Sequence, residues 1–131
     1  MKLAFITGAT KGIGRSTAIT FAKAGWDLIL LSRDLEMMKA LKDELSDTKS
    51  KINLVKCDLS SEYEIEKSVK ESIKKYGCPS VLINNAGTAF NGKLVEMPLK
   101  KWQEIIQINL TSVFQICSLI VPQMRKNGGT I

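Results

Sequence analysis

Thr7-Gly8-Ala9-Thr10-Lys11-Gly12-Ile13-Gly14 joins an apolar run to an amphipathic segment through three glycines. The run Leu3–Ile6 is typical of a short strand, and apolar side chains then recur at helical spacing up to Gly25. Glycine in such a turn permits positive φ angles and close approach of the backbone to a ligand. Because a helix N-terminus offers free N–H groups, the stretch predicts a pyrophosphate-binding turn. A plain glycine turn at a strand–helix junction is the alternative.

The alternation of strand and helix continues through the chain. The predicted strands are Leu3–Ile6, Leu28–Leu31, Ile52–Cys57 and Val81–Ile83. The predicted helices span about residues 13–25, 35–45, 65–76 and 98–124. Asp34 is the predicted cap of the second, and Asp58-Leu59-Ser60-Ser61 is the predicted loop and cap before the third. Pro98 is predicted in the first turn of the last. Right-handed crossovers then give an α/β fold, a doubly wound parallel sheet of strand order 3-2-1-4. Its third strand, the more polar one, is expected at the edge, and Gly128–Ile131 is expected to begin a fifth strand.

Four unusual segments fall at the carboxyl ends of these strands. They are the Gly8 turn, Ser32-Arg33, Cys57-Asp58 and Asn84-Asn85-Ala86-Gly87. Ligands of doubly wound sheets bind at this edge, where the winding reverses. The sequence therefore predicts one binding site between the first and fourth strands.

Composition bounds the function. The chain has 131 residues, 44% hydrophobic and 24% charged, as expected of one soluble domain, and a net charge of +6 that suits an anionic ligand. Its basic residues are scattered among few aromatic ones, so nucleic acid is not an expected partner. Three distant cysteines and no histidine argue against a metal site or disulfide framework. The N-terminus lacks a secretory signal, and a cytoplasmic location is expected.

The last predicted helix contains the longest apolar region, Ile105–Val121. Polar residues interrupt it, which predicts a buried helix and no membrane span. Its apolar surface is wider than one stripe, which predicts that the helix is covered on more than one side. In a chain that ends at Ile131 we expect part of this surface to stay exposed and to cause self-association or poor solubility.

Together, the Thr7–Gly14 stretch, Asp58-Leu59, Asn84-Asn85-Ala86-Gly87 and Asn109 closely resemble the short-chain dehydrogenase/reductase family over the whole chain. The resemblance implies a Rossmann-type, dinucleotide-binding domain over residues 1–131, incomplete at its C-terminus. It also implies that Gly8, Gly12 and Gly14 hold the pyrophosphate, that Asp58 meets the adenine amino group, and that the Asn85-Ala86-Gly87 backbone lies along the adenosine ribose. Thr7, Thr10, Ile13 and Leu59 complete the implied cofactor site.

The residues after the second strand select the cofactor. NAD enzymes place a carboxylate there for the ribose 2′-hydroxyl, whereas this chain has Ser32-Arg33. Arg33 can take a 2′-phosphate, and Lys11 stands where similar NADP-dependent enzymes place a second basic residue. The prediction is NADP(H) over NAD(H), and the alternative is that both are solvated surface charges.

Only part of the family's catalytic apparatus is present. Asn109 resembles the helix asparagine that holds water in the family's proton relay, and the alternative is a buried asparagine that satisfies a helix bend. The catalytic serine, tyrosine and lysine would follow the fifth strand, beyond Ile131. Tyr63 and Lys67 match Tyr-x-x-x-Lys by spacing, but they project away from the predicted core face of their helix and indicate a solvated pair.

The sequence therefore predicts the cofactor-binding portion of an NADP(H)-dependent oxidoreductase that exchanges hydride with a small-molecule carbonyl or alcohol. The isolated 131 residues are expected to be inactive, and the complete protein is expected to be a homo-oligomer. The alternatives are a non-catalytic NADP(H)-binding module and a truncated gene product.

Overall fold

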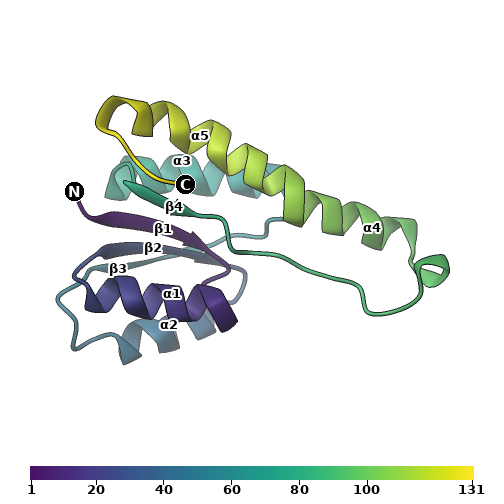
Figure 1. The fold of residues 1–131 in the computed structure, drawn as a ribbon, viewed down its shortest axis with the longest axis horizontal. Helices are drawn as coiled ribbons and strands as arrows, with labels where there is room; N and C mark the ends of the chain where they lie inside the picture. The colour runs from purple at the N-terminus through teal and green to yellow at the C-terminus, as the bar shows by residue number, and fades with distance from the viewer.

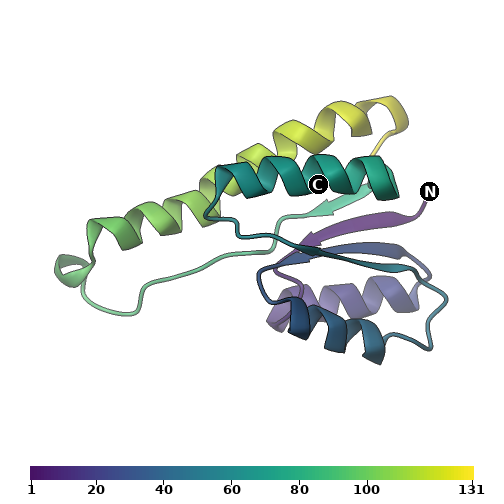
Figure 2. The same ribbon diagram turned by 180° about the vertical axis from the view of Figure 1, so that it is seen from behind.

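The computed structural model describes all residues from Met1 to Ile131. Its centre is a parallel sheet in the order β3-β2-β1-β4, which confirms the predicted strand order and the edge position of the third strand. The strands are β1 (Leu3–Thr7), β2 (Asp27–Ser32), β3 (Ile52–Lys56) and β4 (Val81–Ile83). Figures 1 and 2 show helices on both faces, with α1 (Gly12–Lys23) and α2 (Leu35–Glu44) on one and α3 (Glu62–Tyr76) and α5 (Ser112–Asn127) on the other.

The helix starts follow the expected capping chemistry, with one exception. The Asp34 carboxylate accepts a hydrogen bond of 2.9 Å from the Met37 N–H, and the Ser61 hydroxyl accepts one of 3.2 Å from the Glu64 N–H. Pro98, predicted inside the last helix, instead precedes it, because its extended backbone (ψ of 142°) lies outside the helical range. No side chain caps α1, which begins after Lys11.

The sheet is buried on both faces because its side chains alternate between two cores. Leu28 and Leu30 of β2 pack with the residues under α1 and α2, whereas Ile29 and Leu31 pack with those under α3 and α5. All four side chains are fully buried. The continuously apolar strand that the sequence predicts is therefore the centre of two hydrophobic layers.

The last helix is continuous but irregular. It consists of α4 (Leu99–Ile106), a π-helical turn η2 (Gln107–Thr111) and α5, and it follows the short 3₁₀ turn η1 (Leu94–Glu96). Figure 1 shows α4 projecting beyond the sheet, above the long connection from β4.

One face of this helix packs on the core through Ile108, Ile116 and Ile120, while its other face is open. Leu110 is 65% exposed and Phe114 is 71% exposed. The prediction of a buried helix is therefore wrong, and the expectation of an exposed apolar surface is confirmed. By length and composition alone, Leu99–Asn127 is apolar enough to cross a membrane, a property that core helices of soluble proteins share.

The chain returns to the sheet near its end. The Thr130 N–H donates to the Ser80 carbonyl and the Leu82 N–H donates to the Thr130 carbonyl, each at 3.0 Å. These bonds form a parallel bridge between Thr130 and Val81. At the place where a fifth strand is predicted to begin, the chain therefore makes a single bridge to β4 and no full strand.

Candidate functional site

A cleft of about 910 Å³ lies at the carboxyl ends of the four strands. Residues of all four predicted segments line it, which brings together most of the predicted cofactor residues. These are Gly8, Thr10, Lys11, Ser32, Arg33, Asp58, Leu59, Asn85, Ala86 and Gly87. The cleft lies where ligands of doubly wound sheets bind.

The turn after β1 is shaped by two glycines with positive φ. Gly8 has φ +65°, and a β-carbon there would lie 2.8 Å from the Cα of Ala86, so a side chain has no room. Gly12 has φ +50°, and a β-carbon there would meet no atom within 4 Å. The backbone of Gly12 therefore borders open space at the uncapped, positive end of α1.

A hydrogen-bond network fastens this turn to the segment after β4. The Thr7 hydroxyl accepts hydrogen bonds from the backbone N–H groups of Asn85 (3.1 Å) and Ala86 (3.0 Å). In return, the side-chain amide of Asn85 donates to the carbonyls of Thr7 (3.1 Å) and Gly8 (3.0 Å). Thr7 is buried and lies behind the cleft, so it supports the cleft wall from outside.

Besides Thr7, three more of the predicted cofactor residues do not line the cleft: Gly12, Ile13 and Gly14. Gly14 is buried, and a β-carbon there would lie 2.3 Å from both the Asn85 side-chain nitrogen and the Gly8 carbonyl oxygen. Gly12 and Ile13 line a separate shallow depression along α1, and the Ile13 side chain is 79% exposed. Gly14 therefore allows close packing behind the turn, and the structure gives it no surface in the cleft.

The cleft carries three basic side chains without an ion-pair partner. Lys11 and Arg33 were predicted, and Lys56 at the end of β3 was not. None of them lies within 4 Å of a carboxylate oxygen. Lys56 is the register partner of Ser32 in the neighbouring strand. Its place in the site therefore follows from strand register, which no local sequence motif indicates.

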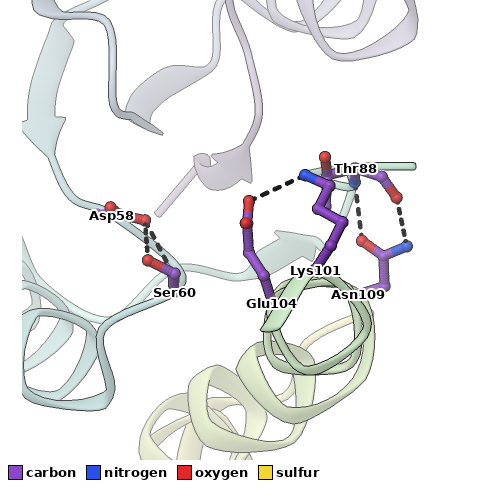
Figure 3. Close-up of polar contacts among 6 residues, drawn as sticks. All are labelled: Asp58, Ser60, Thr88, Lys101, Glu104 and Asn109. Carbon is purple, nitrogen blue, oxygen red and sulfur yellow. Dashed lines mark hydrogen bonds and ion pairs between the residues drawn. The ribbon is translucent and has the colours of Figure 1, made fainter. Parts of the chain in front are cut away.

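Asp58 is held in its ionised form. Burial alone would raise the pKa of its carboxyl, but hydrogen bonds from the N–H (2.9 Å) and hydroxyl (2.8 Å) of Ser60 and the charge of Arg33 lower that pKa below its usual range. Figure 3 shows the Ser60 hydroxyl and N–H directed at the same carboxylate. Asp58 thus presents a fixed acceptor at the cleft wall.

Cys57, which also lines the cleft, was not predicted to be a functional residue. Its side chain is fully buried, and burial raises the pKa of the thiol to about 11 despite a hydrogen bond with Ser68. The charges of Glu64 and Asp58 raise it further. The raised pKa disfavours the thiolate, the nucleophilic form of cysteine, at neutral pH.

Asn109 lies in the π-helical turn and binds the backbone of Thr88. Its side-chain oxygen accepts from the Thr88 N–H and its side-chain nitrogen donates to the Thr88 carbonyl, each at 2.8 Å (Figure 3). Thr88 lines the cleft, whereas Asn109 stands beside it and is exposed. The alternative of a buried asparagine that satisfies the helix bend is therefore wrong, and a role in a proton relay stays a prediction.

Tyr63 and Lys67 stand apart from the cleft. Both side chains are exposed on α3, and Tyr63 is 73% exposed. On the same helix Ile65 and Val69 are fully buried. The pair therefore occupies the solvent face of α3, as predicted.

Comparison with known proteins places the chain in a family. The family model described as short chain dehydrogenase matches residues 2–131. The chain is 34% identical over 130 residues to the 7alpha-hydroxysteroid dehydrogenase of Escherichia coli, covering 99% of this chain and 51% of that protein. It is 32% identical to a 3-oxoacyl-(acyl-carrier-protein) reductase of Thermotoga maritima, covering 99% and 54%. It thus spans about half the length of these relatives.

Solved structures of related enzymes match this chain in fold. The L-sorbose reductase of Gluconobacter frateurii, complexed with NADPH and L-sorbose, matches with a TM-score of 0.91 and 27% identity, over 98% of this chain and 50% of that one. A metagenomic short-chain oxidoreductase in complex with NADP matches with a TM-score of 0.92 and 29% identity, over 98% and 59%. The fold, the cleft and the matched family model together show that this chain belongs to the short-chain dehydrogenase family.

Proposed function

We propose that this chain binds NADP(H) and forms the cofactor-binding portion of an oxidoreductase that acts on a carbonyl or alcohol group. The observation that carries the proposal is the set of charges around the end of β2. Arg33 and Lys11 line the cleft there without ion-pair partners, whereas the nearby Asp34 carboxylate is engaged at the N-terminus of α2. A free carboxylate at this position would take a ribose 2′-hydroxyl, and free cations suit a 2′-phosphate.

The cleft fits a dinucleotide along its length. The uncapped start of α1, whose preceding residue Lys11 lines the cleft, suits a pyrophosphate, which helix N-termini bind through backbone N–H groups. The ionised Asp58 is an acceptor suited to an adenine amino group. Gly87 adds exposed backbone on the opposite wall. The related structures that contain NADPH or NADP support the same assignment.

When bound, the cofactor supplies the hydride, and the residues of this chain bind and orient it. Thr7 and Asn85 keep the two walls of the cleft together while the cofactor is bound. Asn109 is proposed to fix Thr88, and through it the wall that continues from β4, and to position water for proton transfer.

A second candidate function is a non-catalytic NADP(H)-binding module. It is favoured by the position of the tyrosines, because neither Tyr63 nor Tyr76 lines the cleft. Proton transfer by a placed side chain contributes about 10²- to 10⁴-fold to rate. We therefore expect the 131-residue chain to bind NADPH and to reduce carbonyl compounds poorly or not at all.

The test is calorimetric titration of the 131-residue chain with NADPH and with NADH, followed by NADPH oxidation assays with a panel of aldehydes and ketones. Tighter binding of NADPH is the expected result, and equal or weaker binding of NADPH would contradict the cofactor assignment. Turnover of any carbonyl substrate by this chain would exclude the non-catalytic module.

A further inference from the structure

We infer that Lys56 is a third determinant of cofactor choice and lies beside the phosphate that distinguishes NADP(H) from NAD(H). The inference rests on the proposed function and extends it, because neither a strand motif nor the glycine turn includes this residue. It starts from the pairing of β2 with β3, in which Lys56 lies opposite Ser32, the residue before Arg33.

Strand register places Lys56 on the side of the sheet that α1 and α2 cover, which is also the side of Lys11. Side chains of paired residues in neighbouring parallel strands point to the same face, about 4.8 Å apart along the hydrogen-bonding direction. Lys56 follows Leu54 by two positions, and Leu54 packs with the core under α1 and α2. Lys11 precedes the first residue of α1, on that same side. Arg33 directly follows Ser32, the register partner of Lys56, and all three cations line the cleft.

The acidic side chains of the cleft form no ion pair with these cations, and only Asp58 is influenced by one of them, the charge of Arg33. Asp34 caps α2, and Glu36 pairs with Lys39 at 3.0 Å. Asp58 accepts both hydrogen bonds from Ser60.

By contrast, Lys11, Arg33 and Lys56 form no ion pair and are exposed. Cleft-lining cations that form no ion pair within 4 Å suit a polyanionic group, and a phosphate monoester carries up to two negative charges. A ligand with only a 2′-hydroxyl at this place would leave the cations unused.

The test compares Lys56→Gln with Lys51→Gln, which removes the same charge just before the other end of β3, outside the cleft. For an exposed cation facing a phosphate we expect Lys56→Gln to weaken NADPH binding about three- to tenfold and to leave NADH binding unchanged. Lys51→Gln should bind both cofactors like the wild type. If the wild type prefers NADPH and Lys56→Gln keeps the full preference, the inference is overturned. If the wild type shows no preference, the proposed function fails first.

A second measurement needs no variant. Lysine acetylation of the wild-type chain, followed by mass spectrometry, should show that NADP⁺ protects Lys56 and that NAD⁺ does not, while Lys51 reacts equally in both. Equal labelling of Lys56 with the two cofactors, in a chain that binds NADP⁺ more tightly, would overturn the inference.

Discussion

Gly14 lies so close to Asn85 that a β-carbon on the glycine would stand 2.3 Å from the asparagine side-chain nitrogen. This contact is what lets helix α1 approach the segment after β4. The two glycines of the motif therefore differ in their surroundings, because Gly12 faces open space and Gly14 faces protein.

The first prediction concerns these two glycines. Gly14→Ala should lower the free energy of unfolding by about 1–3 kcal/mol or more, because an added methyl group overpacks the site and displaces the Asn85 amide. Gly12→Ala should lower the free energy of unfolding by about 1–2 kcal/mol through backbone strain at φ +50°. It should weaken cofactor binding more than Gly14→Ala does. Urea denaturation and calorimetry measure both quantities. A larger stability loss in Gly12→Ala than in Gly14→Ala would contradict the packing role of Gly14.

The second prediction concerns the Thr7 hydroxyl. Thr7→Val keeps the shape of the side chain but leaves the Ala86 N–H without its acceptor, at about 1–3 kcal/mol. The Asn85 N–H loses one of its two acceptors and keeps the Ile83 carbonyl at 3.1 Å. Thr7→Ser keeps the hydroxyl and is the matched control. Urea denaturation should rank the valine variant as the least stable of the three proteins. A valine variant as stable as the serine variant would show that the hydroxyl does not hold the two segments together.

The third prediction concerns Arg33. Arg33→Ala should weaken NADPH binding about ten- to a hundredfold, the value of one charge-assisted contact, and leave NADH binding unchanged. Arg15→Ala is a suitable control because Arg15 pairs with Glu44 and does not line the cleft. Titration of both variants with both cofactors decides the question. An Arg33→Ala variant that retains its preference would remove the main support for NADP(H).

The fourth prediction concerns Cys57 and alkaline pH. The thiol has a pKa of about 11 in the folded chain against 9.0 ordinarily, so the folded chain holds this proton more tightly than the unfolded chain. Its contribution to stability is complete below about pH 9 and is lost as the pH rises towards about 11. Between these values, Cys57→Ala should lose less stability than the wild type.

A direct readout of Cys57 is alkylation. At pH 8, a shift from 9.0 to about 11 leaves about a hundredfold less thiolate, so iodoacetamide should modify Cys57 about a hundredfold more slowly in the native chain than in the urea-unfolded one. Peptide mass spectrometry follows the site. Rapid alkylation of Cys57 in the native chain would show that the thiol is accessible and ionised.

The fifth prediction concerns the open side of the last helix. Trp102, Ile106, Leu110 and Phe114 recur every four residues there, and all are exposed. We expect the 131-residue chain to self-associate through this surface. Sedimentation velocity should show a shift towards monomer in Phe114→Lys. Leu94→Lys, at an equally exposed leucine in η1, should leave the association unchanged. A monodisperse wild-type monomer would contradict the prediction.

Much of the fold could be predicted because its signals are local. The apolar run Leu28–Leu31 identifies the central strand, and the side chains of Asp34 and Ser61 mark the first turns of two helices. The π-helical turn at Gln107–Thr111 could not be predicted in the same way. Its Asn109 binds the backbone of Thr88, a tertiary contact that no local pattern of residues encodes.

Site residues that belong to a sequence motif could be predicted, whereas a residue brought to the site by strand register could not. The Gly8 turn and the Asn85–Gly87 segment reach the cleft as expected. Lys56 reaches it only because β3 pairs with β2 in a given register, which no short stretch of sequence encodes. Gly14 was assigned to the ligand because a motif lists residues without stating which of them face the protein.

The four hydrogen bonds that join Thr7 and Gly8 to Asn85 and Ala86 also bear on how tightly a ligand can bind. They hold both walls of the cleft in place before any nucleotide arrives. Ordering a loop on binding subtracts conformational entropy from affinity, and walls that are already ordered avoid that loss. The nucleotide should therefore bind with little backbone rearrangement, because the cleft is preorganised.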